Sequence, residues 1–163
     1  MKGTRFSMRW LLAVALLVSG AVQAQAQTPQ VYVDAVDYPT LSAGWEAFLD
    51  LERRLAEDFD QICGDTFCEG EYSDYQPLRL RCSVRQSDGV VGQCVWTFAA
   101  SEASIDPATG QVQVDARLWQ CPTPLLPHTR LVALYKALAV EHPLFAPLPH
   151  SDRSINDGLI DCL

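Results

Sequence analysis

Apolar residues recur at steps of three and four positions after Pro39, and this spacing predicts an amphipathic helix. Thr40 or Ser42 can cap its start, because a hydroxyl oxygen there accepts a hydrogen bond from a first-turn amide. Gly64 can end it, since glycine adopts the left-handed conformation that often follows a helix. The apolar side holds Leu41, Trp45, Phe48, Leu51, Leu55, Phe59 and Ile62, and the other side, which we expect to be solvated, holds Glu46, Asp50, Glu52, Arg53, Arg54, Glu57 and Asp58.

Alternation of apolar and polar residues replaces the helical spacing beyond residue 77 and predicts three antiparallel strands. Glycine, proline and aspartate at 86–89 and 105–110 predict the turns between them. The resulting meander has one face that a helix can cover. We expect that face to hold Leu78, Leu80, Cys82 and Val84 of the first strand, Cys94, Trp96 and Phe98 of the second, and Val112, Val114, Ala116 and Leu118 of the third.

The remaining segments complete one α+β domain over residues 40–163, in which an N-terminal and a C-terminal helix pack on a small antiparallel β-meander of three to four strands. Residues 27–39 predict either an edge strand or a mobile N-terminal arm. A second helix is predicted from Thr129 to a point before Pro143, and the proline-rich run 143–149 should lie extended on the surface. Ser154 and Asp157 are spaced as the capping pair of a last short helix.

The first 26 residues have the three parts of a secretory signal peptide: basic residues, an apolar stretch and a small-residue cleavage site. Cleavage after Ala26 fits best, with Ala24 as the next choice. A transmembrane anchor is the alternative, but the apolar stretch is shorter than the roughly 20 residues that span a bilayer. We therefore expect a periplasmic or secreted protein that does not stay in the membrane after the signal peptide is removed.

The chain is strongly acidic, with a formal net charge of −8 that becomes −11 when residues 1–26 are removed. Nucleic acids and anionic membranes attract proteins through clusters of Lys and Arg, so both are poor partners for such a surface. The charge either keeps an exported protein dissolved or steers a cationic protein partner towards it.

Six cysteines follow the signal peptide, and an even number in an exported chain predicts disulfide bonds and no free thiol. Cys82 and Cys94 lie almost symmetrically about the turn at 88–89, so a hairpin would place them opposite each other. Cys63 and Cys68 could close a short loop, which leaves Cys121 to pair with Cys162. A zinc site is disfavoured because no two cysteines have the Cys-x2-Cys spacing, and we expect no cofactor.

The most unusual stretch is 63–75, which combines two cysteines, two glycines, four acidic residues and three aromatic residues. A disulfide-closed loop of this composition predicts a protein-binding surface, because a rigid loop loses little conformational entropy on association. Phe67, Tyr72 and Tyr75 would be its anchors, unless Phe67 and one of the tyrosines pack the loop onto the core instead. The predicted binding residues are Asp65, Glu69, Glu71, Tyr72, Asp74 and Tyr75 of the loop, with Arg79 and Arg81 of the adjacent strand.

Catalytic and metal chemistry has weaker support. No serine lies in a Gly-x-Ser-x-Gly elbow, and His128, His142 and His150 are most simply surface histidines. Glu69 and Glu71 are the one carboxylate pair that we weigh as a small envelope hydrolase acting on glycan or peptidoglycan. A further alternative is a calcium site, which would draw oxygen ligands from Asp65, Glu69, Glu71 or Asp74.

The run 62–72, with later cysteines at 82 and 94 and a Cys-Leu end, resembles small cysteine-bearing exported proteins of Gram-negative bacteria that have no assigned function. The general build is similar to that of periplasmic inhibitor and immunity proteins, which are small, exported, disulfide-bonded and non-catalytic. The second resemblance implies a protein that neutralises an envelope-acting enzyme. It carries no motif, so it transfers no site residue.

Overall fold

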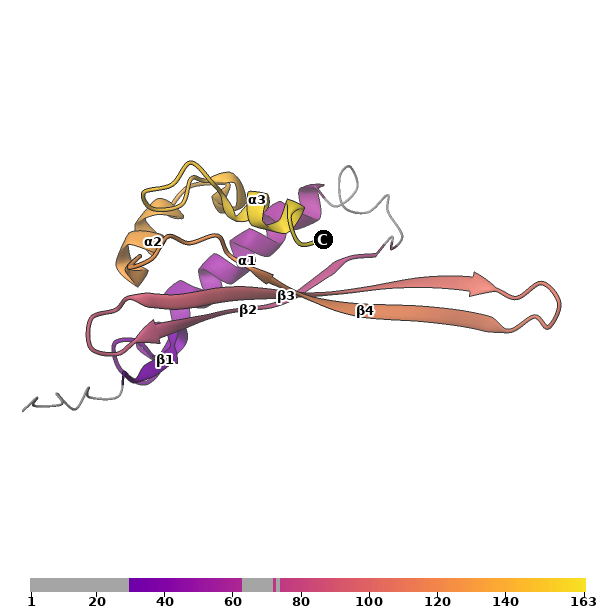
Figure 1. The fold of residues 1–163 in the computed structure, drawn as a ribbon, viewed down its shortest axis with the longest axis horizontal. Helices are drawn as coiled ribbons and strands as arrows, with labels where there is room; N and C mark the ends of the chain where they lie inside the picture. Colours follow the sequence, from indigo (N-terminus) through magenta and orange to yellow (C-terminus); the bar gives the residue numbers. More distant parts are fainter. Residues whose placement is uncertain (1–29, 63–71, 73) are drawn as a thin grey trace, which may run out of the picture.

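The computed structural model describes residues 30–62, 72 and 74–163, and within them it shows an α+β fold with an antiparallel sheet (Figure 1). The α+β class predicted from the sequence is therefore confirmed. The elements in chain order are β1 (Tyr32–Asp34), the 3-10 helix η1 (Ala35–Asp37), α1 (Trp45–Ile62), β2 (Gln76–Arg85), β3 (Val91–Ile105), β4 (Val112–Pro122), α2 (Leu131–Ala137), the 3-10 helix η3 (Pro143–Phe145) and α3 (Ile155–Ile160).

The sheet has the strand order β1-β2-β3-β4, with every neighbouring pair antiparallel. The predicted meander is present, and residues 32–34 add a short edge strand that pairs with the end of β2. Both predicted turns occur, and each needs a glycine: Gly89 has φ 72° and Gly110 has φ 70°. Residues with a β-carbon rarely adopt such angles.

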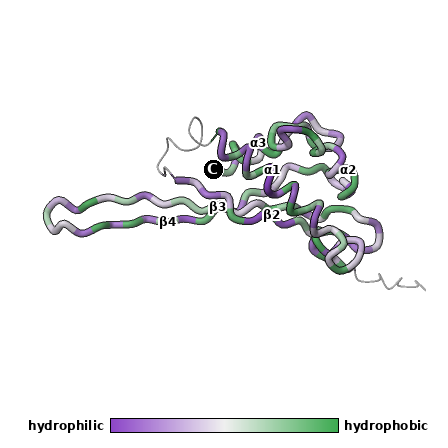
Figure 2. The backbone as a smooth tube through the Cα atoms, turned by 180° about the vertical axis from the view of Figure 1, so that it is seen from behind, coloured by the Kyte–Doolittle hydropathy of each residue, from purple (hydrophilic) through white to green (hydrophobic). Residues whose placement is uncertain are grey.

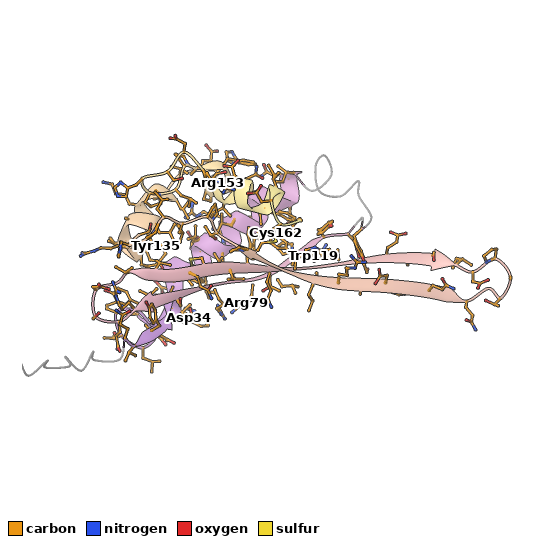
Figure 3. All side chains as sticks on the ribbon, viewed as in Figure 1. Asp34, Arg79, Trp119, Tyr135, Arg153 and Cys162 are labelled. Atoms are coloured by element: carbon orange, nitrogen blue, oxygen red, sulfur yellow. A yellow bond between two sulfur atoms is a disulfide. The ribbon has the colours of Figure 1, made fainter. Side chains whose placement is uncertain are left out.

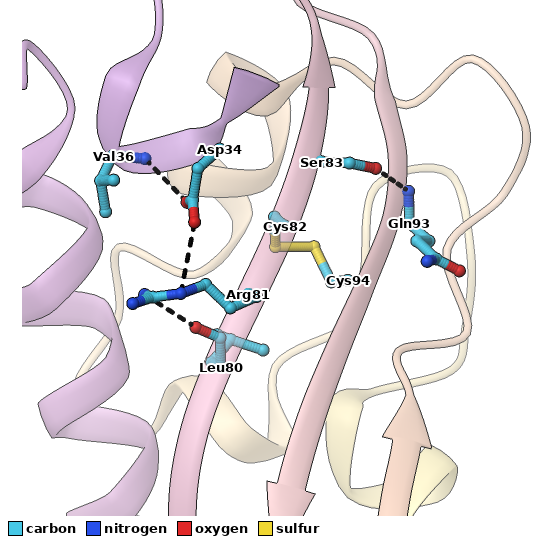
Figure 4. Close-up of a disulfide and its surroundings, with 8 residues drawn as sticks. All are labelled: Asp34, Val36, Leu80, Arg81, Cys82, Ser83, Gln93 and Cys94. Carbon is cyan, nitrogen blue, oxygen red and sulfur yellow. Dashed lines mark hydrogen bonds and ion pairs between the residues drawn. A yellow bond between two sulfur atoms is a disulfide. The ribbon is translucent and has the colours of Figure 1, made fainter. Parts of the chain in front are cut away.

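Two of the predicted disulfides are present. Cys82 and Cys94 are directly opposite each other in the β2–β3 ladder, with their Cα atoms 4.0 Å apart (Figure 4). Cys121 of β4 is bonded to Cys162, which lies just after α3. The third predicted pair, Cys63 with Cys68, lies outside the described residues. The second bond holds the end of the chain to the sheet, where a terminus would otherwise fray.

The core lies where α1 meets the middle of the sheet. Phe59 of α1 contacts the rings of Trp96 and Phe98 in β3, with centroid distances of 6.1 and 4.9 Å. All three side chains are nearly or fully buried, and aromatic groups of this size dominate the apolar area that a small domain removes from water. The capping box of Ser154 and Asp157 starts α3, as the sequence predicted.

The first helix begins at Trp45, four residues later than a cap at Thr40 would place it and two later than a cap at Ser42 would. Residues 40–44 form turns instead, because Ser42 has φ 60° and a helix cannot continue through that angle. Gly44 follows, where a β-carbon would collide with the backbone oxygen of Ala35. The N-terminal segment therefore packs closely against the entrance to α1.

Asp58 is a correction to the predicted solvated face of α1, since only 3% of its surface is exposed. Its carboxylate accepts a hydrogen bond from the backbone N–H of Leu144 at 3.0 Å and contacts His142 Nδ1 at 2.9 Å. The proline-rich run was expected to be extended on the surface, and that is also wrong. It forms η3 and buries Leu144 and Leu148, whose backbone N–H groups are satisfied by Asp58 and by the carbonyl of Arg153.

The inward face predicted for β4 is wrong. Val112, Val114, Ala116 and Leu118 are all exposed, with fractions of 64%, 66% and 70% for Val112, Val114 and Leu118. Register explains this: Leu118 pairs with Ala99, whereas the buried Phe98 pairs with Trp119, so Leu118 points to the face opposite the core. Leu78 is also partly exposed, because the β2–β3 register shifts between Pro77 and Arg79.

The outer parts of β3 and β4 extend well beyond the helices as a two-stranded ribbon (Figure 1). We call residues 101–116 the distal hairpin. The β3–β4 pairing runs without a register shift from Ile105↔Val112 to Val95↔Pro122. At its tip, Asp106 accepts hydrogen bonds from the backbone N–H groups of Ala108 and Thr109, which fixes the turn.

Candidate interaction surface

The two tyrosines predicted as binding anchors lie in the core. Tyr72 is 2% exposed and Tyr75 is 6% exposed. Both rings contact Trp119, at centroid distances of 5.3 and 5.1 Å, and Figure 3 shows Trp119 where the distal hairpin leaves the body. This corrects their expected role as exposed anchors, since in this conformation both rings stabilise the base of the hairpin.

Asp74 also holds the base of the distal hairpin. Its carboxylate accepts hydrogen bonds from the backbone N–H of Ser101 at 2.7 Å and from the Ser101 hydroxyl at 2.9 Å. These bonds to Ser101 favour the ionised form and lower the pKa of Asp74. The Tyr72 hydroxyl donates a hydrogen bond to Asp115 at 2.6 Å. The end of the 63–75 loop is therefore fastened to the root of the hairpin.

The other acidic candidates, Asp65, Glu69 and Glu71, lie outside the described residues. The hydrolase carboxylates and most of the suggested calcium ligands fall in that same segment. Among the residues that the structure describes, no group of three or more His, Cys, Asp or Glu could hold a metal ion.

Arg79 and Arg81 lie on β2, each about half exposed, and each forms an ion pair within the chain. Arg79 is 3.4 Å from Glu52 of α1, and Arg81 Nε is 3.2 Å from Asp34 of β1, a contact drawn in Figure 4. Both arginines are thus held in place by acids of the body. Exposed pairs of this kind contribute little to stability, and they leave one side of each guanidinium accessible.

The register places these arginines on the same side as a long row of β3 and β4 residues. Arg79 is opposite Thr97, Arg81 is opposite Val95, and Ala99 is opposite Leu118. We call this side of the sheet the open face. Its members are Arg79 and Arg81 of β2, Val95, Thr97, Ala99, Ser101, Ala103 and Ile105 of β3, and Val112, Val114, Ala116, Leu118 and Gln120 of β4.

The β3 and β4 part of the open face carries no charge, although the chain as a whole has a net charge of −8. The charges of the same two strands, Glu102, Asp115 and Arg117, lie on the other face. Figure 2 shows hydrophobic and hydrophilic residues alternating along both strands of the distal hairpin. Large exposed apolar patches with a polar rim mark protein interaction sites more often than ordinary surface.

Two shallow depressions lie along the open face. One, of about 410 Å³, is bounded by Gln76, Ala99 and Leu118 at the root of the distal hairpin. The other, of about 330 Å³, is bounded by Asp34, Arg81 and Val95 near β1. Both depressions therefore lie in the part of the open face nearest the body, and the uncharged row of the distal hairpin extends beyond them.

Sequence reasoning missed this surface because it treated every apolar position of β4 as part of the core. The chain did contain a signal in β3, where the large apolar residues change from even positions, Trp96 and Phe98, to the odd position Ile105. A change of phase within one strand moves the apolar side to the other face of a sheet.

No family model, curated protein or solved structure matches the chain. In the described part of the chain, no helix is both long enough and apolar enough to cross a membrane. The disulfides Cys82–Cys94 and Cys121–Cys162 are compatible with an exported protein, since such bonds persist in oxidising compartments.

Proposed function

We propose that this chain is an exported, non-catalytic protein-binding domain of the periplasm or the secreted fraction, and that its open face is the binding surface. The observation that carries the proposal is the exposed, uncharged apolar row of the distal hairpin on an otherwise acidic protein. An ordinary surface strand would place polar side chains on the solvent side.

The helices support this choice of surface. We take α1 and the C-terminal α3 to form the layer that packs on the meander, which leaves the opposite face available for a partner. The hairpin ladder is unbroken and its turn is capped, so a partner would not have to order it on binding.

The partner that fits is a protein with an apolar strip bordered by basic groups. The apolar strip would pack on Val112, Val114 and Leu118, and the basic border would be attracted by the net negative charge of the domain. An inhibitor or immunity protein acting on an envelope enzyme is the biological role that we propose for such a domain. Asp65, Glu69 and Glu71 remain proposed contributors to the same acidic attraction.

The test is a capture experiment from envelope and secreted fractions with the tagged mature chain. Val114→Ser with Leu118→Ser replaces the apolar row with polar groups and adds no charge. We expect it to reduce capture of a specific partner by about tenfold or more. Gln113→Ser is the matched control, because Gln113 lies on the same strand with its side chain on the opposite face. Equal capture of the partner by the wild type, the double variant and the Gln113→Ser control would contradict the proposal.

A further inference from the structure

The two edges of the sheet are built differently. On the β2 side, Glu52 of α1 accepts the backbone N–H of Leu80 at 2.7 Å, Pro77 removes a donor, and the register shifts between Pro77 and Arg79. Caps, prolines and bulges of this kind prevent a sheet edge from pairing with another chain. From Val112 to Gln120, β4 has no proline, no lysine and no register shift.

The backbone directions in β4 follow from two hydrogen bonds at its ends. The N–H of Asp106 donates to the carbonyl of Gln111, and the N–H of Thr123 donates to the carbonyl of Cys94. Antiparallel pairs alternate between bonded and non-bonded positions, so the odd residues of β4 bond to β3. The N–H and C=O groups of the even residues, 112 to 120, therefore point to the free edge. Within the described residues no other strand pairs with this edge.

We propose that two copies of this chain pair through this edge, with β4 antiparallel to β4 across a two-fold axis at Ala116. This register places the outward N–H and C=O groups of one copy opposite those of the second copy. It sets Val114 opposite Leu118 of the second copy on the open face. On the other face it sets Asp115 opposite Arg117 of the second copy, and Arg117 opposite Asp115 of the second copy.

Charge favours this register over the two adjacent ones that the backbone allows. A shift of the axis to residue 115 would place two aspartates opposite each other, and a shift to 117 would place two arginines opposite each other. Like charges directly opposite each other on a sheet are destabilising, and opposite charges are stabilising. Asp115 and Arg117 are more than half exposed, and they occupy non-hydrogen-bonded positions of the new ladder, where side chains approach most closely.

The pairing would form up to about ten backbone hydrogen bonds, two at each bonded pair, which is typical of a specific interface. It would also join the apolar rows of two distal hairpins into one continuous strip. The contact is a single strand pair, at the small end of specific interfaces, so we expect a roughly micromolar dissociation constant. The dimer leaves the open face accessible, and it does not depend on the proposed partner.

Sedimentation velocity of the mature chain from roughly 1 µM to 1 mM tests the proposal. We expect a concentration-dependent monomer–dimer equilibrium in the wild type. Asp115→Arg alone and Arg117→Asp alone each place like charges across the axis, and each should raise the dissociation constant by about tenfold to a hundredfold. An equimolar mixture of these two variants should form heterodimers, because each charge then meets its opposite.

Glu102→Arg is the matched control. Glu102 pairs with Asp115 across the β3–β4 ladder on the same face but is one strand away from the edge, so it should leave dimerisation unchanged. Ala116→Pro removes an outward N–H and no bond to β3, so it should give a folded monomer. A monomeric wild type, dimerisation that persists in Ala116→Pro, or single charge variants that dimerise like the wild type would each overturn the proposal.

Discussion

Apolar and polar residues alternate in both halves of the β3–β4 hairpin, but the large apolar residues are buried in one half and exposed in the other. In the half next to the helices, Trp96 and Phe98 are 1% and 0% exposed, and Phe59 of α1 contacts both rings. In the distal half, Ile105 and Val114 are 63% and 66% exposed. A period of two therefore predicts a strand, while the register decides which face of the sheet its apolar residues occupy and so whether the helices can bury them.

The two halves also differ in what holds them. The inner half is stabilised by removing apolar surface from water, which contributes roughly 25 cal/mol per Å². The distal half has the backbone ladder, the capped turn, and polar contacts at its root such as Asp74 with Ser101. Isolated two-stranded ribbons are only marginally stable in water, so these contacts and the rigid continuation of β3 from the body keep the hairpin extended.

The largest expected difference between the two halves is in the unfolding free energy that an alanine substitution costs. Phe98→Ala would remove a fully buried ring and leave a cavity against α1, which typically costs about 3–5 kcal/mol of unfolding free energy. Leu118→Ala, at an exposed site, should change it by less than about 0.5 kcal/mol. Urea unfolding at about 0.05 µM, well below the expected dissociation constant of the dimer, measures both on monomers. Similar losses in the two variants would mean that the open face at Leu118 is covered in solution.

The pH should change the free energy of unfolding through a contact of the body, the one between His142 and Asp58. The hydrogen bond to Asp58 raises the pKa of His142 above the ordinary histidine value of about 6.5 in the folded protein. Protonated His142 therefore contributes stability that is fully present below about pH 6.5 and is lost as the pH rises through the raised folded value. Urea midpoints measured from about pH 5 to 9 should show this decline.

Two histidine variants sharpen the pH test. His142→Gln should flatten the decline, because an amide can still donate to Asp58 but does not titrate. His128→Asn should keep it, since asparagine tolerates the positive φ of 65° at that position. An unchanged slope in His142→Gln would show that another group titrates with folding.

Local sequence patterns were sufficient for much of the body. The helical spacing predicted most of α1, and glycine and proline predicted both hairpin turns. The symmetry of Cys82 and Cys94 about one turn predicted their bond, because two residues at equal distances from a hairpin turn must be opposite each other. Each of these features depends on residues that are close in sequence or related by one turn.

The failures all involve partners that are distant in sequence. Asp58 looked like one more charge on a solvated helix, and only the return of the chain at 142–144 makes it a buried acceptor. The same contact pairs the backbone N–H of the buried Leu144, and the N–H of the buried Leu148 is paired with the carbonyl of Arg153. The exposed row of β4 depends on its register with β3, which places the even residues of β4 on the face opposite the core. The candidate surface was missed for this last reason, and the buried Tyr72 was taken for an anchor.

Shortening the hairpin should have the smallest effect on folding and a large one on association. Replacing residues 103–114 with an Asn-Gly turn keeps the contacts of Asp74 with Ser101 and of Tyr72 with Asp115, and it removes no side chain of the core. Because the deleted segment buries almost no apolar area, the melting temperature should change by only a few degrees. Both partner capture and dimerisation should be lost, since Val114 is gone and, of the five bonded pairs in the dimer ladder, only the pair at Ala116 keeps both partners. A large drop in melting temperature would instead show that the hairpin is part of the folding unit, and the contrast between its two halves would then be one of exposure alone.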